Sequence, residues 1–379
     1  MIIKIQKRAE VEGLIPSSGS KTIIQSKAYR LIQPHQIVES AIAHEVEEGQ
    51  VVVEPSLGSI CHADLRYYSG NRRPEALARK LPMALIHEGI GKIVSSGVPE
   101  LQTGQRVVVV PNIPGYLTDG IPPDQCCPAC RSGHGENYCH RGRFLGSGVD
   151  GLAQSRLVVP APCAIPVPDE VPDGIAVLTE LCSVSYQALA AVADKLAASK
   201  VAVFGDGPVG FLAAAVLHHV YGVERERLLV FGAIPEKLAQ FDFATVSLVQ
   251  DYDFSSGPRF DIAVECTGGR FSESAINQAI AVLRPGGQLI LMGVTEDRVP
   301  INTRDVLEKG IKMRGSSRSS RTDFVPVLQA MKDAGCQRTL GRLLPERRTV
   351  IDSAEDFDAA MREAEAHRSW AKVLLDFRW

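Results

Sequence analysis

The sequence predicts an α/β fold in which a mostly β region is followed by a doubly wound parallel sheet. In the first half of the chain, β-branched segments such as QVVVEPSL (50–57) and QRVVVVPN (105–112) are separated by glycine and proline turns. From residue 201 onward, short apolar strands alternate with helical segments, as a parallel sheet requires. At 379 residues the chain also exceeds what one hydrophobic core usually supports, so we expect two domains.

The same patterns divide the chain into four regions. We expect a mostly β domain over residues 26–168 and the parallel-sheet domain over residues 169–315. Residues 316–379 begin with SSRSSRTDFVPVLQAM and end with the apolar AKVLLDF, which predicts a helix and a closing strand that return to the first domain. Residues 1–25 are an N-terminal extension to which the sequence assigns no role.

Composition and charge limit the kinds of ligand. The net charge of −3 provides no polybasic surface, so neither nucleic acid nor a membrane is an expected partner, and a small molecule is. No apolar run reaches transmembrane length, and the first 25 residues lack the apolar stretch of a signal peptide, which predicts a cytoplasmic location. Nine cysteines in such a chain indicate thiol or metal chemistry rather than disulfides.

The stretch VAVFGDGPVG (201–210) reads as a short strand that runs into a glycine-rich turn. Gly205, Gly207 and Gly210, with Pro208 and Val209 between the last two, have the spacing of a dinucleotide-binding turn. The spacing alone also fits a glycine-rich corner without a ligand. The context favours binding, because an apolar helix (211–222) and a second strand (227–232) follow. Further strands at 260–268 and 286–294 flank a helix at 273–283 and continue the alternation.

Side chains typical of zinc sites occur before and just after the junction of the two domains. Cys61 lies in SICHADLRYYSG, His87 and Glu88 lie in LIHEG, and Glu180 lies in LTELCSVSYQAL. Taken singly, each has an ordinary structural explanation. Together, a thiolate, an imidazole and a carboxylate leave one zinc position open, as a catalytic zinc requires.

These motifs resemble those of the zinc-dependent medium-chain dehydrogenase/reductases. The order Cys-His-Ala-Asp, His-Glu-Gly and then the glycine turn carries the resemblance, which covers residues 26–379. It implies a GroES-like catalytic domain, a Rossmann domain and a zinc ion in the cleft between them. The stretches SICHADLRYYSGNR, KLPMALIHEG, VECTGGRFSESAINQ, NTRDVLEKG and GSSRSS are similar to the ribulose-5-phosphate reductases, which make ribitol 5-phosphate for CDP-ribitol and cell-envelope polymers.

The resemblance implies a zinc-dependent, NADPH-linked reduction of ribulose 5-phosphate, in which zinc on Cys61 and His87, with Glu88 and Glu180 as third ligand or exchange partners for water, binds the C2 carbonyl oxygen. In the alternative, Glu88 contacts the ligands and not the zinc. The resemblance also implies a homodimer and, along the pathway, a ribitol-5-phosphate cytidylyltransferase. Two alternatives stay open: another zinc polyol or sugar dehydrogenase that uses NAD, of the sorbitol, xylitol or threonine type, and a nucleotide-binding protein without catalysis.

Two features depart from the usual family pattern. The position two residues after Cys61, commonly a Ser or Thr that relays protons, is Ala63, so protons need another path through zinc-bound water with Glu88, Glu180 or His62. The stretch DQCCPACRSGHGENYC (124–139) resembles the structural zinc lobe with altered spacing. Its expected ligands are Cys127, Cys130 and Cys139, with Cys126 or Asp124 as the fourth; reduced free thiols are the alternative.

The phosphate groups of substrate and cofactor need cationic or N–H donors. Arg66 and Arg318 are the candidates for the substrate phosphate, although a loop arginine is usually a solvated surface charge. In NAD-binding turns an acidic residue ends the second strand. Here Gly232 occupies that position and Lys237 follows, which favours NADPH; the alternative is a tight turn that is indifferent to the cofactor phosphate.

Overall fold

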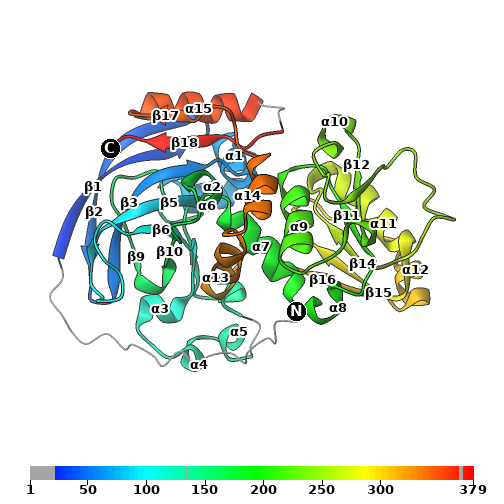
Figure 1. Cartoon of the computed structure of the whole chain (residues 1–379). Helices are drawn as coiled ribbons and strands as arrows, with labels where there is room; N and C mark the ends of the chain where they lie inside the picture. Colours follow the sequence, from blue (N-terminus) through cyan, green and yellow to red (C-terminus); the bar gives the residue numbers. More distant parts are fainter. Residues whose placement is uncertain (1–21, 133–134, 367–369) are drawn as a thin grey trace.

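The computed structural model describes residues 22–132, 135–366 and 370–379. Figure 1 shows two lobes side by side, a β-rich lobe and an α/β lobe, with α7 (Thr179–Ala190) and α9 (Pro208–His219) between them. Of the expected N-terminal extension, residues 1–21 lie outside the described residues, and residues 22–25 belong to the first strand, β1 (Thr22–Gln33). The α/β fold class predicted from the sequence is confirmed.

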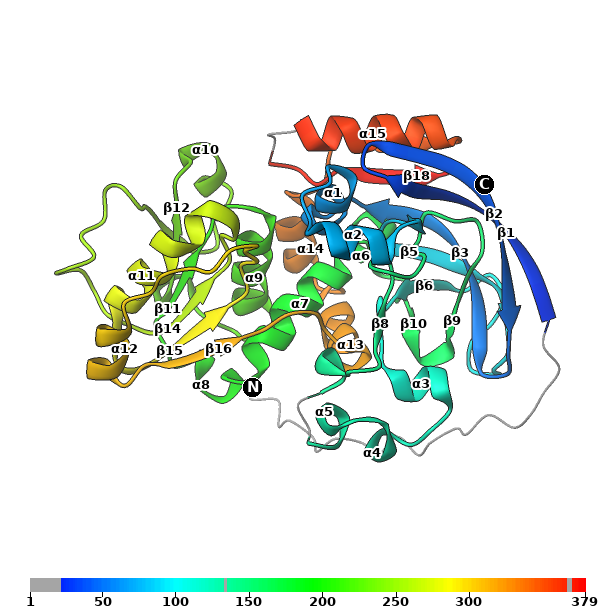
Figure 2. The same cartoon turned by 180° about the vertical axis from the view of Figure 1, so that it is seen from behind.

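The β-rich lobe contains two main sheets, which are best seen from behind in Figure 2. A three-stranded sheet has the order β2 (Gln36–Val46), β1, β4 (Met83–Ala84). The larger sheet has the order β10 (Ala164–Pro166), β6 (Arg106–Val109), β5 (Glu88–Ser96), β3 (Gln50–Ser59), β18 (Leu374–Phe377), β17 (Thr349–Ile351), and β9 (Leu157–Pro160) pairs with β3.

The pairing of β3 with β5 brings distant sequence motifs together. The two strands are antiparallel, and Ser59 near the end of β3 is opposite Glu88 at the start of β5. Cys61 lies two residues after the end of β3 and is the N-cap of α1 (His62–Tyr68). The register therefore places Cys61 beside the His87–Glu88 pair.

The C-terminal segment contributes to both the lobe junction and the larger sheet. It contains α13 (Arg321–Ala330), α14 (Ala334–Gly341), β17, α15 (Ala354–Ala366) and β18. Strand β18 pairs antiparallel with β3, with Leu374 opposite Ser59. The end of the chain is thus next to the strand that leads to Cys61.

The α/β lobe is a six-stranded parallel sheet with helices on both faces. Its strand order is β13 (Thr245–Leu248), β12 (Leu228–Gly232), β11 (Val201–Phe204), β14 (Phe260–Glu265), β15 (Leu283–Leu291), β16 (Lys312–Gly315). The connecting helices are α9, α10 (Pro235–Leu238), α11 (Ser272–Val282) and α12 (Thr303–Lys309). Strands β12 and β13 are added on one side of β11, and strands β14, β15 and β16 on the other, so the strand order changes direction between β11 and β14. Ligands of such sheets bind at the carboxyl ends of the strands at this point.

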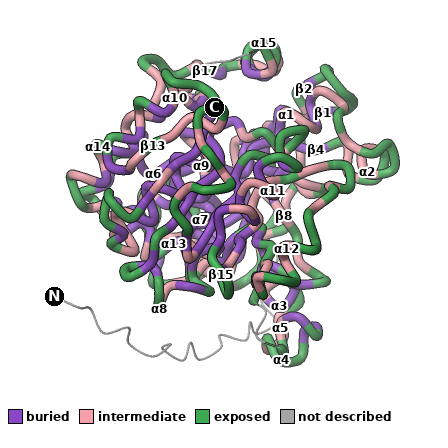
Figure 3. Tube along the Cα trace, turned by 90° about the vertical axis from the view of Figure 1, so that its right-hand side faces the viewer, coloured by how far each residue is buried: buried purple, intermediate pink, exposed green. Residues whose placement is uncertain are grey.

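The lobes share one continuous apolar core, and Figure 3 shows buried backbone passing through α7 and α9 in the middle of the molecule. Helix α7 contacts both α9 and α13. Short helices and strands complete the fold: α2 (Pro74–Lys80), β7 (Asn112–Ile113), α3 (Gly115–Asp119), α4 (Pro123–Cys126), α5 (Pro128–Arg131), β8 (Arg143–Phe144), α6 (Asp173–Ala176) and α8 (Ala193–Leu196). Among the described helices, none has the length and apolar character to span a bilayer.

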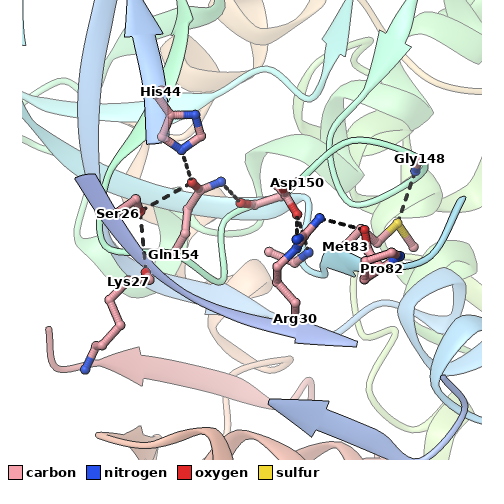
Figure 4. A network of polar contacts seen from close by, with 11 residues as sticks. Ser26, Lys27, Arg30, His44, Pro82, Met83, Gly148, Asp150 and Gln154 are labelled. Carbon is pink, nitrogen blue, oxygen red and sulfur yellow. Dashed lines mark hydrogen bonds and ion pairs between the residues drawn. The ribbon is translucent and has the colours of Figure 1, made fainter. Parts of the chain in front are cut away.

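A polar network fixes the loop that follows β8 (Figure 4). His44 Nε2 lies 2.6 Å from Gln154 Oε1, and Gln154 Nε2 donates to the Gly151 carbonyl at 2.7 Å. Asp150 Oδ1 accepts from Arg30 Nε at 3.1 Å and from the Ala84 N–H at 2.7 Å. The loop is thereby held against the segment that leads directly to His87.

Candidate active site

Cys61, His87 and Glu88 converge at the junction of the lobes. One ligand atom from each, a sulfur, a ring nitrogen and a carboxylate oxygen, lies within 4.8 Å of the other two. His87 is 5% exposed, Glu88 is fully buried and Cys61 is partly exposed, so water can reach the cluster on the Cys61 side. The donor set is one that zinc prefers in proteins.

The charges of this cluster fit a metal cation. Both Glu88 carboxylate oxygens are buried; the Lys372 ammonium lies 2.9 Å from Oε2, and Oε1 accepts no hydrogen bond from the described residues. Burial and then the Glu88 charge raise the pKa of the Cys61 thiol. A buried thiolate and carboxylate this close together repel each other unless a cation lies between them. We infer that the residues present suit a zinc ion.

Asp64 links two of the candidate ligands. Its Oδ2 accepts from the Cys61 N–H at 2.9 Å, and its Oδ1 accepts from the Ile86 N–H at 3.1 Å and lies 3.4 Å from His87 Nδ1. Burial alone would lower the pKa of His87, but the Asp64 carboxylate outweighs it and the pKa is raised. Ile86 has a left-handed φ of 71°, a strained conformation that these contacts hold in place.

Lys372, like Asp64, was not identified from the sequence. Its ammonium donates to the Ile60 carbonyl at 2.8 Å and lies 2.9 Å from Glu88 Oε2. A single lysine in the apolar run AKVLLDF was the available signal, because a charge in a buried strand needs a partner. For Asp64 the signal was its position three residues after Cys61, the spacing of a capping box.

Glu180 and His62 lie at the edge of the cluster. Glu180 is buried in the first turn of α7 and does not belong to the group of converging ligand atoms. Burial raises its pKa to about 7, while His87 is the nearby charge that lowers it most. His62 is exposed on α1, where partial burial and then the Lys372 charge lower its pKa. Ala63, which follows His62, has no group that could move a proton.

The glycine turn forms the end of β11 and the start of α9. Gly205 has φ +133°, and a Cβ at Gly210 would lie 2.0 Å from the Gly205 carbonyl oxygen, so both positions need glycine. Gly207 is the N-cap of α9, with Pro208 and Val209 in the first turn and no side-chain hydrogen bond to the cap. A Cβ at Gly207 would meet no described atom within 4 Å, which leaves room for a ligand. Free N–H groups at this helix start suit a pyrophosphate.

A carboxylate lies at the end of β12, where the sequence interpretation expected none. Gly232 ends the strand, but Asp206, from within the glycine turn, extends to it. Asp206 Oδ2 accepts from the N–H groups of Ala233 at 2.8 Å and Ile234 at 2.9 Å. The inference that no carboxylate stands there was wrong, because it considered only the strand's own residues. Lys237 follows in α10 and is half-buried.

The four cysteines of the lobe at 124–139 converge as well. The sulfur atoms of Cys126, Cys127, Cys130 and Cys139 lie within 4.8 Å of one another. The N–H groups of Cys130 and His140 lower the pKa of Cys127 to about 6. Asp124 is exposed in α4 and does not belong to the cluster. Four thiols at these distances suit a closed tetrahedral zinc site, and of the two candidates for the fourth ligand it is Cys126 whose sulfur belongs to the group.

The two arginines suggested for the substrate phosphate lie close to the candidate ligands or to the other lobe. Arg66, on α1, is 2.8 Å from Glu296 Oε1 of the α/β lobe. Arg318 stacks on Phe144 at 5.2 Å, and Phe144 lies 5.3 Å from the His87 ring. Burial lowers the pKa of both guanidinium groups, while the charge of the nearby Tyr67 acts in the opposite direction on each.

Comparisons with known proteins agree with this geometry. Residues 47–169 match the alcohol dehydrogenase GroES-like domain, and residues 225–333 match the zinc-binding dehydrogenase family. The ribulose-5-phosphate reductase of Bacillus spizizenii is 36% identical over 93% of this chain and 99% of its own length. Ribulose-5-phosphate reductase 1 of Staphylococcus aureus is 36% identical over 92% of this chain and 98% of its own.

Solved structures give the same result. The crystal structure of S. aureus TarJ in complex with NADPH is 31% identical, with a TM-score of 0.76 over 94% of this chain and 100% of its own. L-Idonate 5-dehydrogenase from Escherichia coli, at 23% identity, has a TM-score of 0.79 over 95% of this chain and 100% of its own, and shows the shared fold. The chain therefore belongs to the zinc-dependent medium-chain dehydrogenase/reductase family, in the group of the ribulose-5-phosphate reductases, as its motifs predicted.

Proposed function

We propose that this enzyme reduces D-ribulose 5-phosphate to D-ribitol 5-phosphate with NADPH in a zinc-dependent reaction. The observation that carries the proposal is the convergence of Cys61, His87 and Glu88 in a chain similar over its described length to ribulose-5-phosphate reductases. The product would supply CDP-ribitol synthesis for cell-envelope polymers, through a ribitol-5-phosphate cytidylyltransferase. We further propose a cytoplasmic homodimer without nucleic acid or membrane partners.

In this proposal Cys61, His87 and Glu88 hold the zinc ion, with Glu180 as an additional or exchanging ligand. When bound, zinc supplies Lewis-acid stabilisation of the developing oxyanion and NADPH supplies the hydride. Asp64 orients the His87 ring through Nδ1 and holds the Cys61 backbone. Its two contacts keep the candidate ligands in place before substrate arrives.

Other residues bind the cofactor and relay a proton to the product. Gly205, Gly207 and Gly210 allow the cofactor pyrophosphate to approach the start of α9. His62 is exposed beside Cys61, and its lowered pKa keeps the ring neutral near pH 7. A neutral imidazole can relay a proton from water to the product oxygen, a role that Ala63 cannot fill.

The decisive experiment measures initial rates with ribulose 5-phosphate and unphosphorylated ribulose, each with NADPH and with NADH. We expect the phosphorylated substrate with NADPH to give the highest kcat/KM. Comparable rates without the phosphate, or a preference for NAD with sorbitol, xylitol or threonine, would support the alternative of a polyol or sugar dehydrogenase.

A variant separates catalysis from nucleotide binding. Cys61→Ser should abolish turnover and leave NADPH binding intact, because Cys61 lies in the β-rich lobe and the glycine turn lies in the other. Full turnover by enzyme proved free of metal would contradict the zinc mechanism.

A further inference from the structure

Two arginines of the β-rich lobe share one carboxylate of the α/β lobe. Arg66 and Arg72 lie 2.8 Å and 3.3 Å from Glu296 Oε1, which belongs to the segment after β15. The Nε atoms of both arginines are buried and have no hydrogen-bond partner among the described residues. Glu296 therefore satisfies only part of the donor capacity of this pair, because each guanidinium offers five N–H donors.

Lys80 is a third cation, at the hydroxyl end of Tyr67. Lys80 Nζ donates to the Tyr67 hydroxyl at 2.7 Å and to Ser147 Oγ at 2.8 Å. The Arg72 guanidinium stacks over the Tyr67 ring at 4.7 Å, and Lys80 Nζ lies 5.4 Å from the same ring. Tyr67 is buried, and the polar network around the loop after β8 fixes the segment that carries Ser147. The ring is thus a rigid support under Arg72.

The balance of charge here favours an anion. Glu296 pairs with Arg66 and Arg72, whereas Lys80 donates to the hydroxyl groups of Tyr67 and Ser147, so positive charge is in excess. Arg66 lies on α1, which begins directly after Cys61, and the Cys61 thiol is among the charged groups that act on its guanidinium. This proximity suits a short sugar chain with its carbonyl at the metal cluster and its phosphate at the arginines. Guanidinium pairs with free N–H donors are the common recognition element for phosphate.

We propose that Arg72, acting with Arg66, determines specificity for the phosphate of the substrate, and that Glu296 is the counter-ion which this phosphate displaces. The inference rests on the proposed function for the identity of the phosphorylated substrate. It adds Arg72 and Glu296 to the site and gives Tyr67 and Lys80 a positioning role. Because Glu296 belongs to the opposite lobe, phosphate binding would replace an ion pair between the two lobes with one between the arginines and the substrate.

The test uses zinc-loaded enzyme with saturating NADPH. Arg72→Met should raise the KM for ribulose 5-phosphate about 10- to 100-fold, the cost of one charged hydrogen-bonding partner. It should leave kcat/KM for unphosphorylated ribulose nearly unchanged. Arg72→Lys should be intermediate, since it keeps the charge and loses the planar fork. Glu296→Gln should lower the KM for ribulose 5-phosphate, because the competing charge is removed.

Arg73→Met is the matched control, because Arg73 is the next residue and is exposed. It should leave both substrates unaffected. Inhibition by inorganic phosphate provides a readout that does not depend on the substrate: its Ki should rise in Arg72→Met and fall in Glu296→Gln. If Arg72→Met does not fold, Arg72→Lys and Glu296→Gln still carry the test.

The outcomes separate the two proposals. Equal changes for phosphorylated and unphosphorylated ribulose, or a Ki for phosphate that neither variant alters, would overturn the role of Arg72 and Glu296. An unmodified enzyme that does not discriminate for the sugar phosphate would overturn the proposed substrate, while the phosphate Ki of the variants still decides whether this pair binds the anion.

Discussion

The ammonium of Lys372 lies 2.9 Å from Glu88 Oε2, and both side chains are buried. Lys372 precedes the last strand of the protein, whereas Glu88 begins β5, so the C-terminal segment delivers a charge to the candidate zinc cluster. Burial alone would lower the pKa of Lys372, but the Glu88 charge outweighs it and raises the pKa. The lysine therefore stays protonated and balances the carboxylate.

Removing the lysine should destabilise the protein strongly. In metal-free protein, Lys372→Met leaves Glu88 as an uncompensated buried charge, which costs about 3–5 kcal/mol of unfolding free energy. The double variant Glu88→Gln/Lys372→Met should recover part of this loss, because both charges are then gone. Urea unfolding of the unmodified protein, the two single variants and the double variant, all free of metal, measures the coupling. Additive effects of the two substitutions would show that the pair does not interact in solution.

The cysteine lobe yields a prediction about zinc content. We expect two zinc ions per chain, one at Cys61, His87 and Glu88 and one at the four cysteines of the lobe. Cys126→Ala should reduce the content to one, because the thiol of Cys126 belongs to the cluster. Asp124→Ala should leave it at two. Elemental analysis of the purified variants distinguishes them, and the opposite pattern would make Asp124 the fourth ligand.

Asp206 should influence the choice of cofactor. Its carboxylate lies at the end of β12, where the adenosine ribose of a dinucleotide is bound, and would repel a 2′-phosphate. Asp206→Asn keeps an oxygen that can accept from the Ala233 and Ile234 N–H groups. We expect it to improve kcat/KM for NADPH over NADH about fivefold, equivalent to about 1 kcal/mol of repulsion.

A nearby carboxylate serves as the control for this prediction. Glu236 is exposed in α10, and Glu236→Gln should have a smaller effect on cofactor preference. Gly232→Asp is a poor test of the same region, since a Cβ at Gly232 would lie 2.6 Å from Asp206 Cβ. An unchanged cofactor ratio in Asp206→Asn would place the ribose phosphate away from this strand end.

The sequence predicted the fold well because its signals are local. The alternation of strands and helices after residue 201 and the glycine spacing each depend on a short window. Cys61, His87 and Glu88 could be grouped because their motifs match a family, and the β3–β5 register is what places them together. Their roles, like those of Glu180 and His62, stay predictions until tested.

What the sequence could not provide depends on contacts between distant segments. Lys372 reaches Glu88 only because β18 pairs with β3. Asp206 reaches the end of β12 only because the glycine turn and that strand end are adjacent in the parallel sheet. Glu296 meets Arg66 only across the two lobes. In each case the tertiary structure brings the two partners together, and a local sequence pattern does not identify them.

His219 should make stability depend on pH in the acidic range. It lies in the last turn of α9, where burial and then the neighbouring His218 lower its pKa to about 4, and its Nε2 lies 2.8 Å from Thr339 Oγ1. An unfolded histidine has a pKa of about 6.5, so the folded state favours the neutral ring. The contribution to stability is therefore complete above pH 6.5 and is lost as the pH falls towards 4.

Replacing this ring with a side chain that does not titrate should remove that dependence. For His219→Gln we expect the stability lost between pH 6.5 and pH 4 to be smaller than in the unmodified enzyme by about 1–2 kcal/mol, a value reduced for partial exposure of the ring. The glutamine amide can keep a hydrogen bond to Thr339. The difference in stability between the two proteins at pH 7.5 should therefore be an offset that does not vary with pH above 6.5. Thermal unfolding across this range measures both proteins, and any loss of metal at low pH affects them equally. Parallel profiles would mean that His219 titrates with the same pKa in the folded and unfolded chain.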